Sequence, residues 1–170
     1  MAKFKGGKDV AITAIISAIL VVSKFALSFI PNVEVVTTLV ICFSFVFGFK
    51  GVFATLIFCT ADILIYPPSI DVIISYYIYW DLLALIVVAF REFGVKNKNA
   101  YLILGLVMTL IFGAITSFFN HLFYGTPFLA VYLAGVYFYA IQLVSTLVFL
   151  GVGFTPIVKV LRRIEDKIYN

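Results

Sequence analysis

Polar side chains that could bind a small molecule flank a proline near residue 30. The stretch Leu27–Leu39 reads LSFIPNVEVVTTL, and Lys24 lies just before it. The Lys24 ammonium, the Asn32 amide and the Glu34 carboxylate together donate and accept hydrogen bonds and carry charges of both signs. Such groups either pair with each other across a turn or line a binding pocket.

Further polar side chains lie near the ends of apolar segments, beside connections that contain proline. These connections read SFIPN, YPPSI and LFYGTP. Proline restricts the backbone, so it lowers the entropic cost of holding such a connection in place. We expect a binding site at this face of the molecule, covered by the first connection as a lid. The polar groups nearest these connections are Asp62, Asp71, Asn120 and His121.

Two apolar segments carry aromatic and polar residues at helical spacing. At 100° per residue, four residues of SYYIYWD fall within an arc of about 140°, namely Tyr76, Tyr77, Trp80 and Asp81. A second set on the last segment falls within about 80° and consists of Tyr132, Gly135, Tyr139, Gln142 and Thr146. Flat rings with a few hydrogen-bonding groups suit a small planar polar ligand. The candidate substrate-binding residues are Lys24, Asn32, Glu34, Tyr76, Tyr77, Trp80, Asp81, Asn120, His121, Tyr139 and Gln142.

The elements that must position these residues follow from composition. Hydrophobic residues occupy 64% of the 170 positions and charged residues 12%, whereas soluble domains are about 45–50% apolar and about 25% charged. Lipid must therefore cover part of the surface, and a transmembrane helix needs roughly 20 apolar residues. We predict an all-α integral membrane protein, with residues 1–170 forming one domain of six transmembrane helices. Their ranges are about 9–29, 33–49, 51–66, 72–90, 100–121 and 128–158.

The distribution of basic residues predicts the orientation. With six spans, both termini and every lysine and arginine except Lys24 fall on one side of the membrane. Short cytoplasmic segments are enriched in these residues, so this side is expected to be cytoplasmic. The basic pI then reflects topology, and we expect no nucleic-acid partner. Cys42 and Cys59 lie within spans without metal-ligand spacing, so neither a metal site nor a cofactor is predicted.

The first helix is expected to present two different faces. Thr13, Ser17 and Lys24 form a polar stripe. Ala14 and Ala18, in the sequence AIISA, belong to a separate face about 110° away. Small residues four positions apart let another helix approach closely. The polar face is expected to serve a pocket and the alanine face a partner.

Several of these motifs resemble the substrate-binding S components of energy-coupling factor (ECF) transporters. They are SFIPNVEVVT, the alanines Ala14 and Ala18, and SYYIYW, and the resemblance covers nearly the whole chain. It implies a multi-pass protein of the bacterial cell membrane that binds a water-soluble vitamin or related heterocycle with high affinity. It further implies that the alanine face docks on a transmembrane coupling subunit driven by two cytoplasmic ATPases. The vitamin stays open among riboflavin, cobalamin, pyridoxine-like compounds, pantothenate, queuosine-type bases and others.

Two other classes of protein are weighed against this one. A small structural membrane protein of the rod-shape-determining MreD type would have similar helices but would need no enclosed polar pocket. An intramembrane enzyme could use Asp62, Asp71, Asp81 and His121 as acid and base groups. However, the sequence contains no H-E-x-x-H or G-x-S-x-G motif, and no G-x-x-x-x-G-K-[ST] phosphate loop. We therefore expect a binding protein and not an enzyme.

Overall fold

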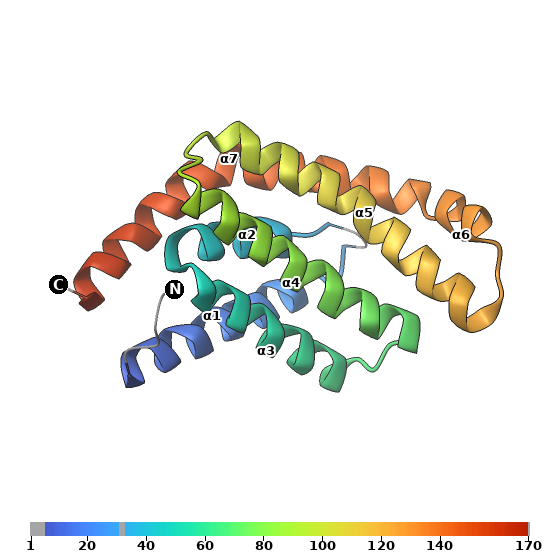
Figure 1. The fold of residues 1–170 in the computed structure, drawn as a ribbon, viewed down its shortest axis with the longest axis horizontal. Coiled ribbons are helices and arrows are strands. Elements are labelled where there is room, and N and C mark those ends of the chain that lie inside the picture. Colours follow the sequence, from blue (N-terminus) through green and yellow to red (C-terminus); the bar gives the residue numbers. More distant parts are fainter. Residues whose placement is uncertain (1–5, 31–32, 170) are drawn as a thin grey trace.

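The computed structural model describes residues 6–30 and 33–169, which form seven helices (Figure 1). No strand occurs within these two ranges, so the all-α prediction is confirmed. The helices are α1 (Gly7–Ala26), α2 (Val36–Phe47), α3 (Phe49–Ile65), α4 (Ile70–Glu92), α5 (Lys98–Tyr124), α6 (Phe128–Ala134) and α7 (Val136–Tyr169).

Four helices of the described chain, α1, α4, α5 and α7, are long and apolar enough to cross a membrane. Their exposed surfaces carry large apolar side chains such as Val22, Ile103 and Val152. These features indicate a multi-pass membrane protein. The predicted number of six spans is not confirmed, because α2 and α3 have only 12 and 17 residues.

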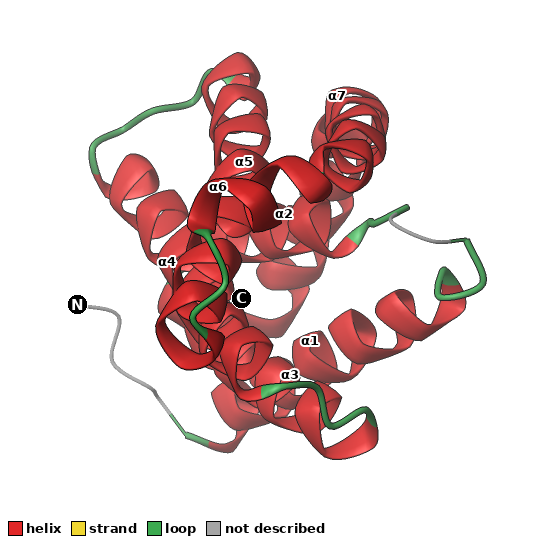
Figure 2. Cartoon of the chain, turned by 90° about the vertical axis from the view of Figure 1, so that its right-hand side faces the viewer, coloured by secondary structure: helices red, strands yellow, loops and turns green. Residues whose placement is uncertain are grey.

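Helix α2 is short and is surrounded by other helices. Its 12 residues extend about 18 Å at 1.5 Å per residue, whereas the hydrocarbon core of a bilayer is about 30 Å thick. All its residues except Leu39 are buried, and it packs against α3, α4 and α7. Figure 2 shows α2 between the pair α1 and α3 and the pair α5 and α7. Its apolar side chains therefore contact protein, where the sequence analysis expected a lipid-facing span.

The connection between α2 and α3 is a single glycine. Gly48 has a φ of 62°, in the left-handed region that glycine adopts without strain. A Cβ atom on Gly51 would lie 2.6 Å from the Cα of Ser44, so the two helix backbones touch there. The segment GFKG is therefore a tight turn between two helices.

The last predicted helix is divided in two. The short α6 ends at Ala134, and α7 starts at Val136 and continues to Tyr169. The 34 residues of α7 extend about 51 Å, which exceeds the thickness of a bilayer core. The basic segment after residue 158 is thus a continuation of α7, beyond the end predicted for the last helix.

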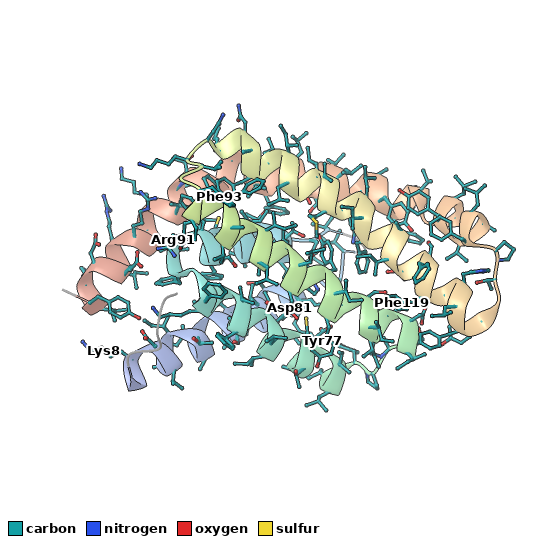
Figure 3. All side chains as sticks on the ribbon, viewed as in Figure 1. Lys8, Tyr77, Asp81, Arg91, Phe93 and Phe119 are labelled. Carbon is teal, nitrogen blue, oxygen red and sulfur yellow. The ribbon has the colours of Figure 1, made fainter. Side chains whose placement is uncertain are left out.

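The start of α1 and the end of α7 lie at the same end of the bundle (Figure 1). Lys8 Nζ donates a hydrogen bond of 2.9 Å to the carbonyl oxygen of Ile168. Lys50 Nζ, next to the α2–α3 turn, lies 3.3 Å from Asp9 Oδ1. Figure 3 shows Lys8 and Arg91 at this end as well. The basic segments that were predicted to share one side of the membrane therefore meet in space, while the α3–α4 and α5–α6 connections lie at the opposite end.

Candidate functional site

A cavity of about 190 Å³ lies between α1, the α1–α2 connection, α4, α5 and α7. Part of its wall is the connection itself, through residues that include Leu27, Ile30 and Val33. The connection that was predicted to cover a binding site therefore lines a cavity. The predicted substrate-binding residues that line the cavity are Lys24, Glu34, Tyr76, Trp80 and Gln142.

Lys24 is held by groups from two other helices. Its Nζ lies 2.5 Å from Asp62 Oδ2 of α3 and donates a 3.1 Å hydrogen bond to the hydroxyl of Tyr76 on α4. It also lies 4.4 Å from the centre of the Tyr76 ring, within the range of a cation–π interaction. The ion-pair partner of Lys24 is thus Asp62, and not Glu34 across the turn, because α1 packs closely on α3.

Glu34 is positioned by its backbone. Its amide donates to Ser145 Oγ at 2.8 Å, and the same hydroxyl donates to the Glu34 carbonyl oxygen at 2.9 Å. Ser145 of α7 thereby fixes the α1–α2 connection against the bundle. The Glu34 carboxylate accepts from the amide of Thr37 and makes a long 3.5 Å contact with the Thr37 hydroxyl. Because α2 begins at Val36, Glu34 precedes the helix, although its carboxylate still lies at the helix N-terminus.

Burial sets the acidity of Glu34, which lies in the connection and not in a spanning helix. Burial raises its pKa to about 7 from an ordinary value of 4.5, and the nearby positive charge of Lys24 and the Thr37 donors offset only part of this rise. A buried carboxylate that lacks a close cation prefers its neutral form. Glu34 therefore changes charge near neutral pH.

Aromatic rings form the wall opposite Glu34. The rings of Tyr79 and Trp80 meet edge to face with centroids 4.6 Å apart, and Tyr79 lies 5.0 Å from Phe112 of α5. The Tyr79 hydroxyl is 3.2 Å from Thr37 Oγ1. Among the described side chains, the indole Nε1 of Trp80 is one of the few buried polar atoms without a hydrogen-bond partner. The cavity thus combines flat apolar surface with charged and polar groups.

The predicted stripe on α4 divides between two environments. Tyr76 and Trp80 line the cavity, whereas Tyr77 and Asp81 face α3 (Figure 3). The Tyr77 hydroxyl lies 2.9 Å from Thr60 Oγ1, and Thr55 donates a 2.6 Å hydrogen bond to Asp81 Oδ1. An arc of about 140° is wide enough to reach both neighbours of a helix. Asp81 thus has a polar partner within the bundle, but it does not line the cavity.

The residues predicted at the end of α5 form a separate cluster. Asn120 Nδ2 donates to Asp71 Oδ2 at 3.0 Å, and its Oδ1 accepts from Thr126 Oγ1. The ring nitrogen Nδ1 of His121 lies 2.7 Å from the Thr126 carbonyl oxygen. These contacts tie the start of α4 and the α5–α6 connection together. Neither Asn120 nor His121 lines the cavity.

Two further predicted site residues do not contribute to the cavity as described. The Tyr139 ring covers Gly113 of α5 and Gly135, so closely that a Cβ atom on either glycine would collide with it. Its centroid is 5.3 Å from that of Tyr132. Asn32 lies outside the described residues.

The two faces predicted for α1 are distinct in the fold. Thr13 and Ser17 are buried, and Ser17 donates to the backbone of its own helix and to the Ala54 carbonyl oxygen of α3. This part of the polar stripe therefore joins α1 to α3 and does not line the cavity. Ala14 and Ala18 are exposed on the other face.

Sequence reasoning missed three residues that shape this cavity. Tyr79 follows Tyr76 by three positions, so helical spacing alone could have found it. Ser145 precedes Thr146, which does belong to the predicted face, and nothing in the sequence links it to Glu34. Phe112 carries no polar signal that distinguishes it from a lipid-facing residue.

Comparison of the chain with models of protein families, with curated proteins and with solved structures finds no match. Within the described residues, no group of three histidine, cysteine or acidic side chains is placed to hold a metal ion. The arrangement is suited to enclosing a small flat molecule between aromatic rings and charged groups.

Proposed function

We propose that this protein is the substrate-binding subunit, or S component, of an ECF-type transporter that takes up a vitamin-like heterocycle. The observation that carries the proposal is the cavity in which Lys24 and Glu34 face aromatic rings of α4. Its covering connection belongs to the SFIPNVEVVT stretch, on which the resemblance to S components depends. The same residues thus support the proposal through chemistry and through resemblance.

The size of the cavity narrows the proposed substrate. At about 190 Å³ it is smaller than the roughly 300–1,000 Å³ of sites for drug-sized ligands. A one- or two-ring heterocycle suits this volume better than a large cofactor such as cobalamin. The rings of Tyr79, Trp80 and Phe112 favour a flat molecule, because stacked and edge-to-face aromatic contacts add to the burial of apolar area.

The proposed partners follow from the exposed surface of α1. We place both termini in the cytoplasm of a bacterial cell, with six helical segments in the membrane, because the basic segments meet at one end of the bundle. Ala14 and Ala18 would dock on a transmembrane coupling subunit, and two cytoplasmic ATPases would drive uptake. The exposure of both alanines supports this role.

Ligand-dependent thermal stabilisation tests the binding function. The purified protein is heated with and without a mixture of water-soluble vitamins, and at least one vitamin is expected to raise the unfolding temperature. A structural protein of the MreD type would show no such shift. Replacement of Ala14 and Ala18 by tryptophan should abolish uptake in cells and preserve the thermal shift. Loss of the shift would mean that the alanine face belongs to the binding site.

A further inference from the structure

The charges around the cavity do not cancel. Lys24 is the one cationic side chain among the described residues that line it, and Asp62 already neutralises Lys24 at 2.5 Å. Asp62 is not among the lining residues, whereas Glu34 is, so the side chains of Lys24, Asp62 and Glu34 together carry one excess negative charge when ionised. The N-terminus of α2 offsets part of this charge through its dipole, but no further cation lines the described wall. The ionised cavity therefore has a negative excess.

The aromatic wall acts in the same direction. The faces of aromatic rings carry partial negative charge and attract cations. Lys24 already uses the ring of Tyr76 in this way, at 4.4 Å from the ring centre. The rings of Tyr79, Trp80 and Phe112 also line the cavity. An anionic ligand would meet these rings and the Glu34 carboxylate, and would compete with Asp62 for Lys24.

Hydrogen-bonding capacity adds a second requirement. Trp80 lines the cavity with other atoms, because its Nε1 is covered by protein although it has no partner among the described atoms. Gln142 lines the same cavity and can both donate and accept.

We propose that the cavity selects a flat nitrogen heterocycle that carries a positive charge and a hydrogen-bond acceptor. Glu34 is the counter-ion of the charged group, and the Gln142 amide donates to the acceptor. This inference rests on the proposed binding function and specifies the chemical class of its ligand.

Three single-ring probes of nearly equal shape separate charge from size. They are 1-methylnicotinamide, which is a cation, nicotinamide, which is neutral, and nicotinate, which is an anion. Each probe is titrated against the full-length protein in lipid nanodiscs at pH 8, with binding followed by ligand-observed NMR. The cation is expected to bind about tenfold or more tightly than nicotinamide, as is typical of a hydrogen bond to a charged group, and nicotinate is expected to bind most weakly.

A variant and a matched control assign the preference to Glu34. Glu34→Gln should bring the affinities of the cation and of nicotinamide within about threefold, because a neutral amide no longer favours the charge. Glu92→Gln makes the same chemical change at an exposed residue at the far end of α4, and should keep the wild-type order. The wild-type order alone tests the proposal if Glu34→Gln does not fold.

Each outcome separates this inference from the function on which it rests. Tightest binding of nicotinate or nicotinamide would overturn the cationic class and leave the binding function standing. A wild-type order that Glu34→Gln does not change would overturn the role of Glu34. If none of the probes binds and no vitamin stabilises the protein, the proposed binding function fails, and this inference fails with it.

Discussion

The two ends of the bundle each contain a lysine paired with a buried aspartate, and α1 contributes to both pairs. At one end Lys24 of α1 pairs with Asp62, and at the other Asp9 of α1 pairs with Lys50. The side chains of Asp62 and Asp9 are only 3% and 2% exposed, respectively. Composition and burial alone would therefore assign the two pairs the same role.

The surroundings of the two pairs differ. At the Lys50 end, the Tyr169 hydroxyl also donates to Asp9, and the Lys50 ammonium lies 4.7 Å from the centre of the Tyr169 ring. Protein groups thus supply further partners of this pair. At the Lys24 end there is a cavity, whose wall includes the Glu34 carboxylate and the Gln142 amide. Open volume, rather than polarity in a membrane helix, distinguishes a binding site from a structural contact.

Removal of the lysines should show the largest difference between the two ends. Lys24→Met is expected to lower the free energy of unfolding by about 3–5 kcal/mol, because it leaves Asp62 buried and unpaired near the C-terminus of α3, where the helix dipole disfavours an anion. Lys50→Met should cost about 1–2 kcal/mol, since Asp9 keeps the Tyr169 donor and lies in the first turn of α1. Thermal unfolding in detergent measures both values.

A double variant provides the control for this prediction. Lys24→Met combined with Asp62→Asn removes both charges and should regain more than half of the lost stability, because no unpaired charge remains. Equal losses in the two single lysine variants would contradict the distinction between the two ends.

Exchange of the charges of Lys24 and Glu34 should fail to restore binding. Glu34→Lys is expected to weaken 1-methylnicotinamide binding by about 1.5–3 kcal/mol, or roughly 10- to 150-fold, because it replaces the proposed counter-ion by a cation. The double exchange should bind no better than Glu34→Lys alone, because a glutamate at position 24 would face Asp62. Near wild-type affinity in the double variant would mean that these residues serve only each other.

The affinity for the cationic probe should depend on pH. Burial raises the pKa of Glu34 to about 7, so ionisation, and with it the affinity for 1-methylnicotinamide, should increase by about tenfold from pH 6 to pH 8. The charged groups that act on Glu34 are Lys24 and Asp62, and Tyr79 lines the same wall. Titration of wild type and of Glu34→Gln at both pH values measures this effect, and a pH-independent wild type would exclude Glu34 as the titrating group.

The same pKa shift has a stability consequence of defined sign. Because the folded-state pKa lies above the ordinary value of 4.5, the folded protein binds the proton more tightly than the unfolded chain. The contribution of Glu34 to stability is therefore fully present below about pH 4.5 and is lost as the pH rises through about 7. Glu34→Gln should flatten this part of the stability profile.

The smallest expected effects come from single donors at the two ends. Gln142→Leu should weaken 1-methylnicotinamide binding by about 1 kcal/mol, or about fivefold, and change stability by less than about 1.5 kcal/mol. Tyr169→Phe should show the opposite pattern. It should lose about 1–2 kcal/mol of stability and keep the affinity within about twofold, since distant sites act independently. Identical patterns in the two variants would contradict the proposed difference.

Much of the fold could be predicted because apolar runs mark helices in a membrane protein as clearly as in a protein core. The ranges expected for the first, fourth and fifth helices differ from α1, α4 and α5 by a few residues. The burial of α2 could not be predicted, because an apolar segment has the same composition whether it faces lipid or protein. The break at Gly135 was missed because the hydrophobic pattern continues across it.

The candidate site was only partly predictable for a related reason. Glu34 and Trp80 were found because a carboxylate or a tryptophan in an apolar segment is unusual. The pairing of Lys24 with Asp62 depends on α1 packing against α3, which no spacing in the sequence reveals. Asp81 and Tyr77 satisfied the same helical pattern as Trp80 but face a different neighbour.

Identification of the small molecule that accompanies the purified protein tests the central claim most directly. The protein is purified from its native membrane without added ligand, denatured in organic solvent, and the released molecules are analysed by mass spectrometry. The account predicts one flat nitrogen heterocycle of one or two rings, positively charged at neutral pH and present in a near-equimolar amount. Absence of any bound heterocycle, together with absence of thermal stabilisation by vitamins, would contradict the claim that this membrane protein is a substrate-binding subunit.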